Sequence, residues 1–373
     1  MSHITNLKLH NFRCYRQAEL QDLGAGLVVL HGPNGAGKTN ILEALSLLVP
    51  GRGLRGAKTM EMQCQDAGQA WAVSGSLQAP YGPVQLGTGL DAKTEKRIIR
   101  INGETARGQN ALAEHLAAVW LTPQMDRLFL DSSSHRRRFL DRLVFAFDPG
   151  HSGRVTRYEN AMRQRSKLLQ ESAEKGGADP SWIKGLESQM AETGVAIAAA
   201  RLEFVDRLQT ATKQSNDEYF PRAIMRATGT LEELLGNESA LAVEELFAYQ
   251  LEQSRKRDGI TGGAGSGPHK SDLQVVYADK DMAADQCSTG EQKALLIGIT
   301  IAHARLIVAE RGQPPLLLLD EVAAHLDEDR RAALYSILQD LGGQAWLTGT
   351  DKNLFDDVGD SAQVFEIRDA QVL

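Results

Sequence analysis

The chain has 373 residues, 42% of them hydrophobic and 35 of them glycine, so it can bury a sizeable core and is neither disordered nor fibrous. Its 41 basic and 48 acidic residues give a net charge of −7, which at first argues against a polyanionic partner. The sequence has only three cysteines, far apart, which predicts no disulfide framework. It has no basic segment followed by an apolar leader and no apolar run near the ~18 residues of a membrane span, so we expect a cytoplasmic protein without a membrane segment.

A glycine-rich turn follows the first apolar run. Residues 27–31 have the composition of a buried strand, and the pattern G-x-x-x-x-G-K-[ST] comes directly after them, followed by apolar residues at helical spacing. Glycines allow backbone N–H groups to close around phosphate oxygens at the positive end of a helix. We expect Lys38 to reach the β and γ phosphates of ATP and Thr39 to bind Mg²⁺. The candidate ATP contacts of this loop are Gly32, Pro33, Asn34, Gly35, Ala36, Gly37, Lys38, Thr39 and Asn40.

The next segments predict an antiparallel lobe and then a helical insert. Strands are expected near residues 71–77, 84–90 and 96–102. Helices are expected over 136–147 and 151–172, in a long segment after the Gly-Pro break at 176–180, and over 241–257. The long segment carries an apolar stripe, which we interpret as the core of a bundle rather than a partner surface: Ile183, Leu186, Met190, Ile197, Phe204 and Leu208.

Two motifs toward the C-terminus complement the P-loop. Ser288 and Gly290 open a long apolar helix, whose N-terminus is a candidate second phosphate site or only a well-capped helix start. Four leucines then lead into Asp320 and Glu321, the pattern of a Walker B strand. At the carboxyl end of such a strand, Asp320 can hold Mg²⁺ and Glu321 can polarise the attacking water, so Lys38, Asp320 and Glu321 are the candidate catalytic residues.

The order of these motifs resembles the ABC-type ATPase head. In that family two heads enclose two ATP molecules, and the signature serine of one subunit faces the nucleotide held by the other. The resemblance implies a homodimer and makes Ser288, Gly290 and the D-loop residue Asp327 candidate ATP contacts.

Further segments resemble the RecF family of bacterial recombination mediators, over essentially the whole chain. They are Asn11-Phe12-Arg13-Cys14-Tyr15, Leu121-Thr122-Pro123, Arg137-Arg138-Phe139-Leu140-Asp141 and Gly267-Pro268-His269-Lys270-Ser271-Asp272-Leu273. The resemblance implies an ATP-dependent DNA-binding protein that dimerises on ATP, binds gaps and junctions, and assists recombinase loading on single-stranded DNA together with mediator proteins. It also makes Arg13 a candidate nucleotide contact and Gln124 a candidate Q-loop residue near Mg²⁺.

The chain departs from a transporter-type head at one informative position. Where such a head has a switch histidine, this chain has Thr348-Gly349-Thr350. A threonine hydroxyl can bond a phosphate or a water but lacks the charge of an imidazole, so we expect slow hydrolysis.

Basic residues gather where DNA could bind. Between residues 135 and 167 nine basic residues face three acidic ones, a local balance of 9 − 3 = +6, and more basic residues follow the P-loop helix. Phosphate contacts of this kind tolerate any sequence and weaken with salt. The candidate DNA contacts are Arg52, Arg55, Arg136, Arg137 and Arg138, for single- or double-stranded DNA of low sequence specificity.

The predicted fold class is therefore α/β. An ABC-type P-loop ATPase head, with a mixed sheet and an antiparallel lobe, is expected from residues 1–125 and 265–373, and a helical lever arm from 126–264. Two alternatives remain open: an SMC-like structural protein that bridges DNA and for which Glu321 would be dispensable, and a transporter ATPase subunit, which the arm length and the missing histidine disfavour.

Overall fold

The computed structural model describes residues 2–65, 68, 70–175, 179–213, 218–359 and 361–373. The chain divides into two compact units. The two-sheet unit comprises residues 2–126, 218–221 and 289–373, and the helical unit comprises 127–213 and 222–288. Residues 265–288, which the sequence analysis assigned to the head, cluster with the helical unit.

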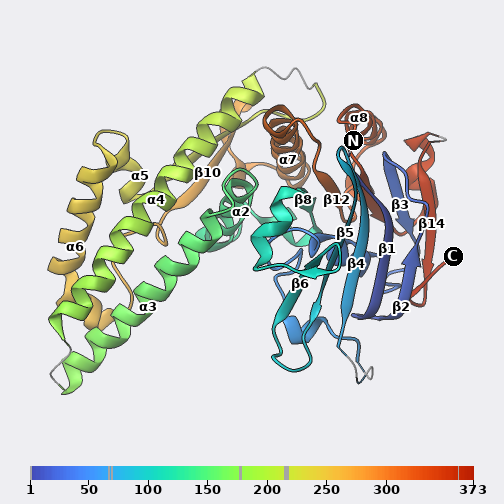
Figure 1. Ribbon diagram of the computed structural model, residues 1–373. Helices are drawn as coiled ribbons and strands as arrows, with labels where there is room; N and C mark the ends of the chain where they lie inside the picture. The colour runs from blue at the N-terminus through green and yellow to red at the C-terminus, as the bar shows by residue number, and fades with distance from the viewer. Residues whose placement is uncertain (1, 66–67, 69, 176–178, 214–217, 360) are drawn as a thin grey trace. The chain divides into compact units, whose positions relative to one another are not determined.

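One sheet of the two-sheet unit is antiparallel and has the strand order β2-β1-β4-β5-β6-β7. Its strands are β1 His3–Phe12, β2 Tyr15–Leu20, β4 Ala72–Ala79, β5 Gly82–Leu90, β6 Arg97–Ile101 and β7 Glu104–Thr105. The three strands predicted for the lobe are β4, β5 and β6, within two residues at either end. Figure 1 shows β1, β4 and β5 side by side.

The second sheet carries the nucleotide motifs and has the order β15-β14-β3-β13-β12-β8. Its strands are β3 Leu27–His31, β8 Ala118–Leu121, β12 Leu316–Leu319, β13 Ala345–Gly349, β14 Gln363–Arg368 and β15 Gln371–Val372, all pairing in parallel except β14 with β15. The helices of the unit are α1 Lys38–Ser46, α7 Thr289–Arg311 and α8 Glu328–Asp340. Side chains of both sheets and of α1 share one apolar core, while Leu317 and Leu319 of β12 pack with side chains of α7 and α8. Because both of its faces are covered, β12 is apolar along its whole length, and β3 is apolar up to His31.

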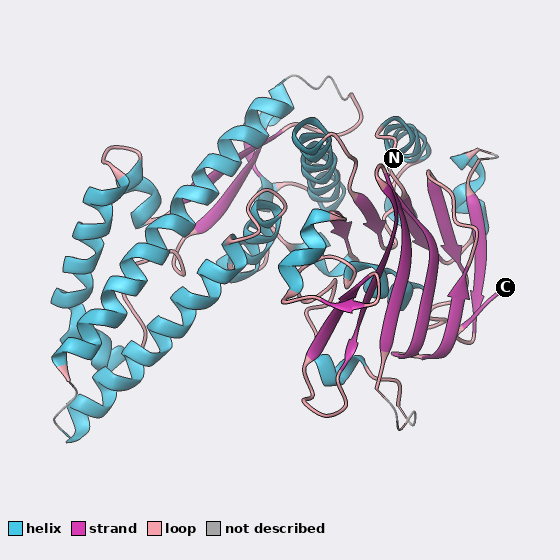
Figure 2. Cartoon of the chain, viewed as in Figure 1, coloured by secondary structure: helices cyan, strands magenta, loops and turns pink. Residues whose placement is uncertain are grey.

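The long helices of the helical unit are α3, α4 and α6, and Figure 2 draws the helices in cyan. Its helices are α2 Ser133–Phe145, α3 His151–Lys175, α4 Pro180–Lys213, α5 Thr230–Leu235 and α6 Ala240–Thr261. All six residues of the predicted apolar stripe lie on α4 and are buried, so the interpretation as bundle core is confirmed. The insert is not wholly helical, because β9 Ala223–Thr228, β10 Asp272–Tyr277 and β11 Met282–Ala283 form a small antiparallel sheet that the sequence analysis missed.

The expectation that no apolar run approaches the length of a membrane span was wrong. Helix α7 is long and apolar enough to cross a membrane by length and composition, although no such run was recognised in the sequence. In the fold, 78% of its most apolar window is buried against other parts of the protein, as is usual for a core helix.

Candidate nucleotide-binding site

The P-loop joins the buried strand β3 to helix α1. Gly32 has a φ of 147°, and a Cβ at this position would lie 2.0 Å from the backbone oxygen of Ile367 in β14. Gly37 caps α1 with a φ of 116°, and a Cβ there would lie 2.5 Å from the hydroxyl of the buried Tyr15. Both glycines are therefore required by the loop's backbone and by its neighbours in the fold.

Lys38 lies inside this turn. Its Nζ donates hydrogen bonds to the backbone oxygens of Gly32 at 2.7 Å and Pro33 at 2.9 Å, and the residue is only 4% exposed. Burial lowers the pKa of Lys38, while the carboxylates of Glu321 and Asp320 act in the opposite direction. The loop thus holds a cation beside its own carbonyl groups, where a phosphate could take their place.

Asp320 and Thr39 meet at the carboxyl end of β12. The Thr39 Oγ1 atom lies 3.0 Å from each of the two carboxylate oxygens of Asp320, so residues 281 positions apart in sequence share one hydrogen-bonded site. Burial raises the pKa of Asp320, and hydrogen bonds from Thr348 and Thr39 oppose the rise. A hydroxyl and a carboxylate are oxygen ligands of the kind that Mg²⁺ takes, so this pair fits the predicted metal site.

Glu321 has an unusual backbone conformation. Its φ is 52°, in the left-handed region that residues other than glycine rarely adopt. Its backbone N–H donates to Thr348 Oγ1 at 2.9 Å, and the same Oγ1 donates to Asp320 Oδ1 at 2.8 Å. The Thr348 hydroxyl, which we expected to be able to bond a phosphate or a water, is bonded in the structure to the Asp320 carboxylate and to the backbone N–H of Glu321.

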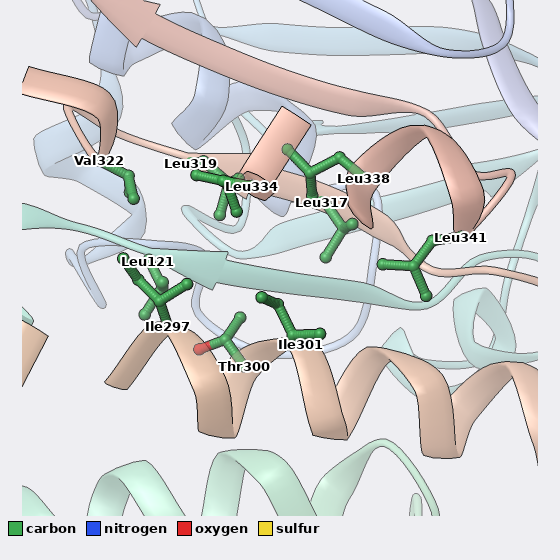
Figure 3. Close-up of a pocket in the computed structure, with 10 residues that line it drawn as sticks. All are labelled: Leu121, Ile297, Thr300, Ile301, Leu317, Leu319, Val322, Leu334, Leu338 and Leu341. Carbon is green, nitrogen blue, oxygen red and sulfur yellow. The ribbon is translucent and has the colours of Figure 1, made fainter. Parts of the chain in front are cut away.

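Apolar packing supports the strand that carries these acids. A cavity of about 10 Å³ lies next to β12. Figure 3 shows the side chains of β12, α7 and α8 that surround it. It is lined by Leu121, Ile297, Thr300, Ile301, Leu317, Leu319, Val322, Leu334, Leu338 and Leu341. A space of this size holds ~one water molecule at most, and its lining is almost entirely apolar, so it is a packing feature and no ligand site.

The predicted signature residues lie at an exposed helix start. Ser288 immediately precedes α7, and Ser288, Thr289 and Gly290 are all exposed, whereas most of the helix beyond them is buried. Within the described part of the chain, a Cβ placed on Gly290 would meet no atom within 4 Å apart from its chain neighbours and its own helix backbone. The fold of this chain therefore does not itself require glycine at position 290.

Asp327 has a local structural role as well as its predicted one. It is the N-cap of α8, where its side chain accepts a hydrogen bond of 2.8 Å from the backbone N–H of Arg330. The residue is exposed at this helix start. The cap explains an aspartate at this position without a second subunit, and the other carboxylate oxygen lies 3.8 Å from Arg330 Nε.

Arg13 pairs with a buried acid on the P-loop helix. Its guanidinium donates to both carboxylate oxygens of Glu43, at 2.8 and 2.6 Å, and Arg55 contacts the same carboxylate at 3.2 Å. Arg55 also donates to Asn40 Oδ1 at 2.9 Å. Arg13 was predicted to contact the nucleotide and Arg55 to contact DNA. In the structure both of them are bound to Glu43, an acid that the sequence did not reveal as a candidate because it stands within an apolar helical run.

Gln124 and its neighbourhood follow β8. Gln124 is exposed in the short 3₁₀ segment Pro123–Arg127. Two residues later, Asp126 lies 3.8 Å from Lys293 Nζ on α7, a contact that the sequence analysis did not foresee. Burial lowers the pKa of Lys293, and the charge of Asp126 counteracts this. The 3₁₀ segment and α7 are thereby linked through a half-buried ion pair.

The arginine run of α2 separates into bonded and exposed members. Arg136 donates to both carboxylate oxygens of Asp272 at 2.7 Å, and Arg137 donates to the backbone oxygen of Ser271 at 2.7 Å. Arg138 is exposed, as is Arg52 of the two-sheet unit. In addition, Arg165, one of the nine basic residues counted in this region, is fully buried between two carboxylates. The local excess of positive charge is therefore smaller at the surface than in the sequence.

Comparisons with known proteins agree with this arrangement of motifs. Residues 3–372 match the RecF/RecN/SMC N-terminal domain model. The DNA replication and repair protein RecF of Rhizobium leguminosarum is 46% identical over 372 residues, covering 99% of this chain and 98% of the relative. The chain belongs to the RecF family.

Solved structures place the fold of this RecF-family chain. A structure of the recombination mediator protein RecF with ATP in the RecFOR pathway superposes with a TM-score of 0.84 at 23% identity, covering 100% of this chain and 97% of that one. An SMC head domain from Pyrococcus furiosus gives 0.55 at 14% identity, covering 100% and 96%. The fold class predicted from the sequence, an α/β ABC-type ATPase head with an inserted helical region, is confirmed.

Proposed function

We propose that this protein is a cytoplasmic, Mg²⁺-dependent ATPase that binds DNA as an ATP-closed homodimer in recombinational repair and replication. The observation that carries the proposal is the meeting of Lys38, Thr39 and Asp320, with Thr39 Oγ1 3.0 Å from both carboxylate oxygens of Asp320. Lys38 would bind the terminal phosphates, Thr39 and Asp320 would hold Mg²⁺, and Glu321 would polarise the attacking water.

Dimerisation is supported by the open start of α7. Among the described residues, and apart from its chain neighbours and its own helix backbone, no atom lies within 4 Å of a Cβ at Gly290, so this exposed helix start is suited to receive a group from outside the chain. In a homodimer that group would be the terminal phosphate of the nucleotide held by the other subunit. Each nucleotide site would then be complete only in the dimer, and hydrolysis would release it.

The family supplies the biological setting of the proposal. Relatives of this chain are named DNA replication and repair proteins, and one relative of known structure is described as a recombination mediator in the RecFOR pathway. We infer the same setting here, with low-specificity binding to gaps, junctions or duplex next to single strands. Mediator proteins and the recombinase would be its protein partners. Because hydrolysis would be slow, the ATP-bound dimer would stay on DNA, and this bound state would be the functional one.

Sedimentation of three proteins with and without ATP and gapped DNA tests this function. The wild type is expected to dimerise with ATP and bind DNA. Lys38→Met should lose nucleotide binding and dimerisation together, because the phosphates lose their buried cation. Ser288→Arg should still bind a fluorescent ATP analogue but remain monomeric, because its exposed side chain fills the interface. Equal dimerisation and DNA binding by all three proteins would sink the proposal.

A further inference from the structure

We propose that Thr348 is a positioning residue for ATP hydrolysis, which holds the Walker B acids in place and does not itself contact the nucleotide. The inference rests on the proposed ATPase function and deepens it by assigning a task to the position where a transporter-type head would have histidine. It is carried by one hydroxyl group that bonds two neighbouring residues at once.

The sheet register brings the three residues together. Strands β12 and β13 pair in parallel, with Leu319 opposite Leu347, so the next residues along lie at the same level, Asp320 just beyond the end of β12 and Thr348 still within β13. Thr348 is 1% exposed, and its Oγ1 lies 2.8 Å from Asp320 Oδ1. Asp320 is thereby held from two sides, by Thr39 at the P-loop and by Thr348 on the neighbouring strand.

The protons of this arrangement can be assigned. A threonine hydroxyl has one proton to donate, and a carboxylate oxygen can only accept, so the proton is directed at Asp320. The backbone N–H of Glu321 must donate to the remaining lone pairs of Oγ1, at 2.9 Å. The single hydroxyl proton is therefore engaged and is not directed at a phosphate in this arrangement.

The contact falls where the backbone is strained. Glu321 has a φ of 52°, a conformation that costs a side-chain-bearing residue free energy and persists only when its surroundings fix it. The hydrogen bond from its N–H to Thr348 is such a fixing contact. Because φ of Glu321 sets the direction of its Cα–Cβ bond, the Thr348 hydroxyl controls where the Glu321 carboxylate is presented.

The test compares three variants with the wild type. Thr348→Val removes both hydrogen bonds at nearly constant volume, and Thr348→Ser retains the hydroxyl. Thr300→Val is the matched control, because Thr300 is also a buried threonine of the two-sheet unit, and its Oγ1 donates to the backbone oxygen of Leu296 on its own helix. The readouts are kcat and KM for ATP, affinity for a fluorescent ATP analogue, and hydrogen exchange of the peptide that contains Glu321.

Thr348→Val is expected to lower kcat by about tenfold or more, while analogue affinity stays within about threefold. Its Glu321 amide should exchange faster than in the wild type. Thr348→Ser should restore both values, and Thr300→Val should change neither. Unchanged kcat and exchange in Thr348→Val, or a Thr348→Ser protein as impaired as Thr348→Val, would overturn the proposal.

The proposed ATPase function and the proposed role of Thr348 are tested by different measurements. A wild type with no hydrolysis above that of Lys38→Met would contradict the proposed function. Even then, hydrogen exchange would decide whether Thr348 holds the Glu321 amide, because exchange requires no turnover. Faster exchange in Thr348→Val alone would support the positioning role, and equal exchange in all proteins would refute it.

Discussion

At the scale of single residues, the glycines of the P-loop meet different demands. Gly32 and Gly35 both have positive φ, at 147° and 80°. A Cβ at Gly32 would nevertheless lie 2.0 Å from a backbone atom of β14, whereas a Cβ at Gly35 would meet no atom of the described residues within 4 Å, its chain neighbours aside. Gly32 is thus needed for close approach as well as for conformation.

This difference predicts unequal costs for two alanine substitutions. Gly35→Ala should destabilise the two-sheet unit by about 1–2 kcal/mol, the cost of a left-handed backbone alone. Gly32→Ala should cost clearly more, because β14 has to move away from the loop. Thermal or denaturant unfolding without nucleotide measures both. A Gly32→Ala protein no less stable than Gly35→Ala would contradict the packing argument.

At the scale of elements, the segment from Pro268 to Asp272 forms hydrogen bonds with side chains of several helices in the helical unit. Arg201 on α4 donates to the Pro268 backbone oxygen at 2.8 Å. The hydroxyl of Tyr158 on α3 lies 2.7 Å from His269 Nδ1, while His269 Nε2 lies 3.0 Å from the Ala264 backbone oxygen. Since a carbonyl only accepts, Nε2 carries the proton and Nδ1 accepts from Tyr158.

The protonation of His269 makes the helical unit sensitive to acid. Burial lowers the pKa of His269, with the charges of Lys270 and Arg137 acting in the same direction and Asp258 and the bond to Ala264 opposing it. The unfolded chain therefore binds this proton more readily than the folded one. Stability is expected to fall as pH drops below about 6.5, the ordinary pKa of histidine.

The experiment is denaturant unfolding of wild type and His269→Gln between pH 7.5 and 5.5. A glutamine can accept and donate hydrogen bonds but does not titrate in this range. The wild type should lose more stability across the range than the variant, and the difference isolates His269 from the other acid-sensitive groups. Parallel pH profiles would show that His269 contributes nothing to the acid response.

At the scale of the whole molecule, net charge is a poor guide to where DNA would bind. Residues 228–253 contain six acidic residues and no basic one, while the candidate DNA contacts lie elsewhere in the sequence. Of those candidates, Arg138 and Arg52 are exposed, but Arg136 is bonded to both oxygens of Asp272. The net charge of −7 is a sum over the whole chain and hides the difference between the acidic segment 228–253 and the exposed candidate arginines.

Salt titrations of DNA affinity separate the two kinds of arginine. Arg138→Ala and Arg52→Ala should each weaken binding and reduce the slope of log affinity against log salt by about 1, the loss of one phosphate contact. Arg136→Ala should instead lower the stability of the helical unit, because it leaves Asp272 without its partner. Arg16→Ala, an exposed change of equal charge on β2, is the control. Equal slopes in Arg138→Ala, Arg52→Ala and Arg16→Ala would remove both candidates.

The sequence alone was sufficient to locate the P-loop, the apolar strand that ends at Asp320 and the core of the bundle. The P-loop, the Walker B strand and the stripe on α4 are recognisable because their signals are local: glycine where φ is positive, an unbroken apolar strand, and apolar residues at helical spacing.

Only the tertiary structure decided which partner each polar side chain takes. Thr348 and Asp320 are 28 residues apart, Arg13 and Glu43 are 30 apart, and Arg136 and Asp272 are 136 apart. No local pattern encodes these pairs, since each depends on strand register or on helix packing in the complete fold. For the same reason the small sheet of the helical unit, and the placement of residues 265–288 within that unit, emerged only from the structure.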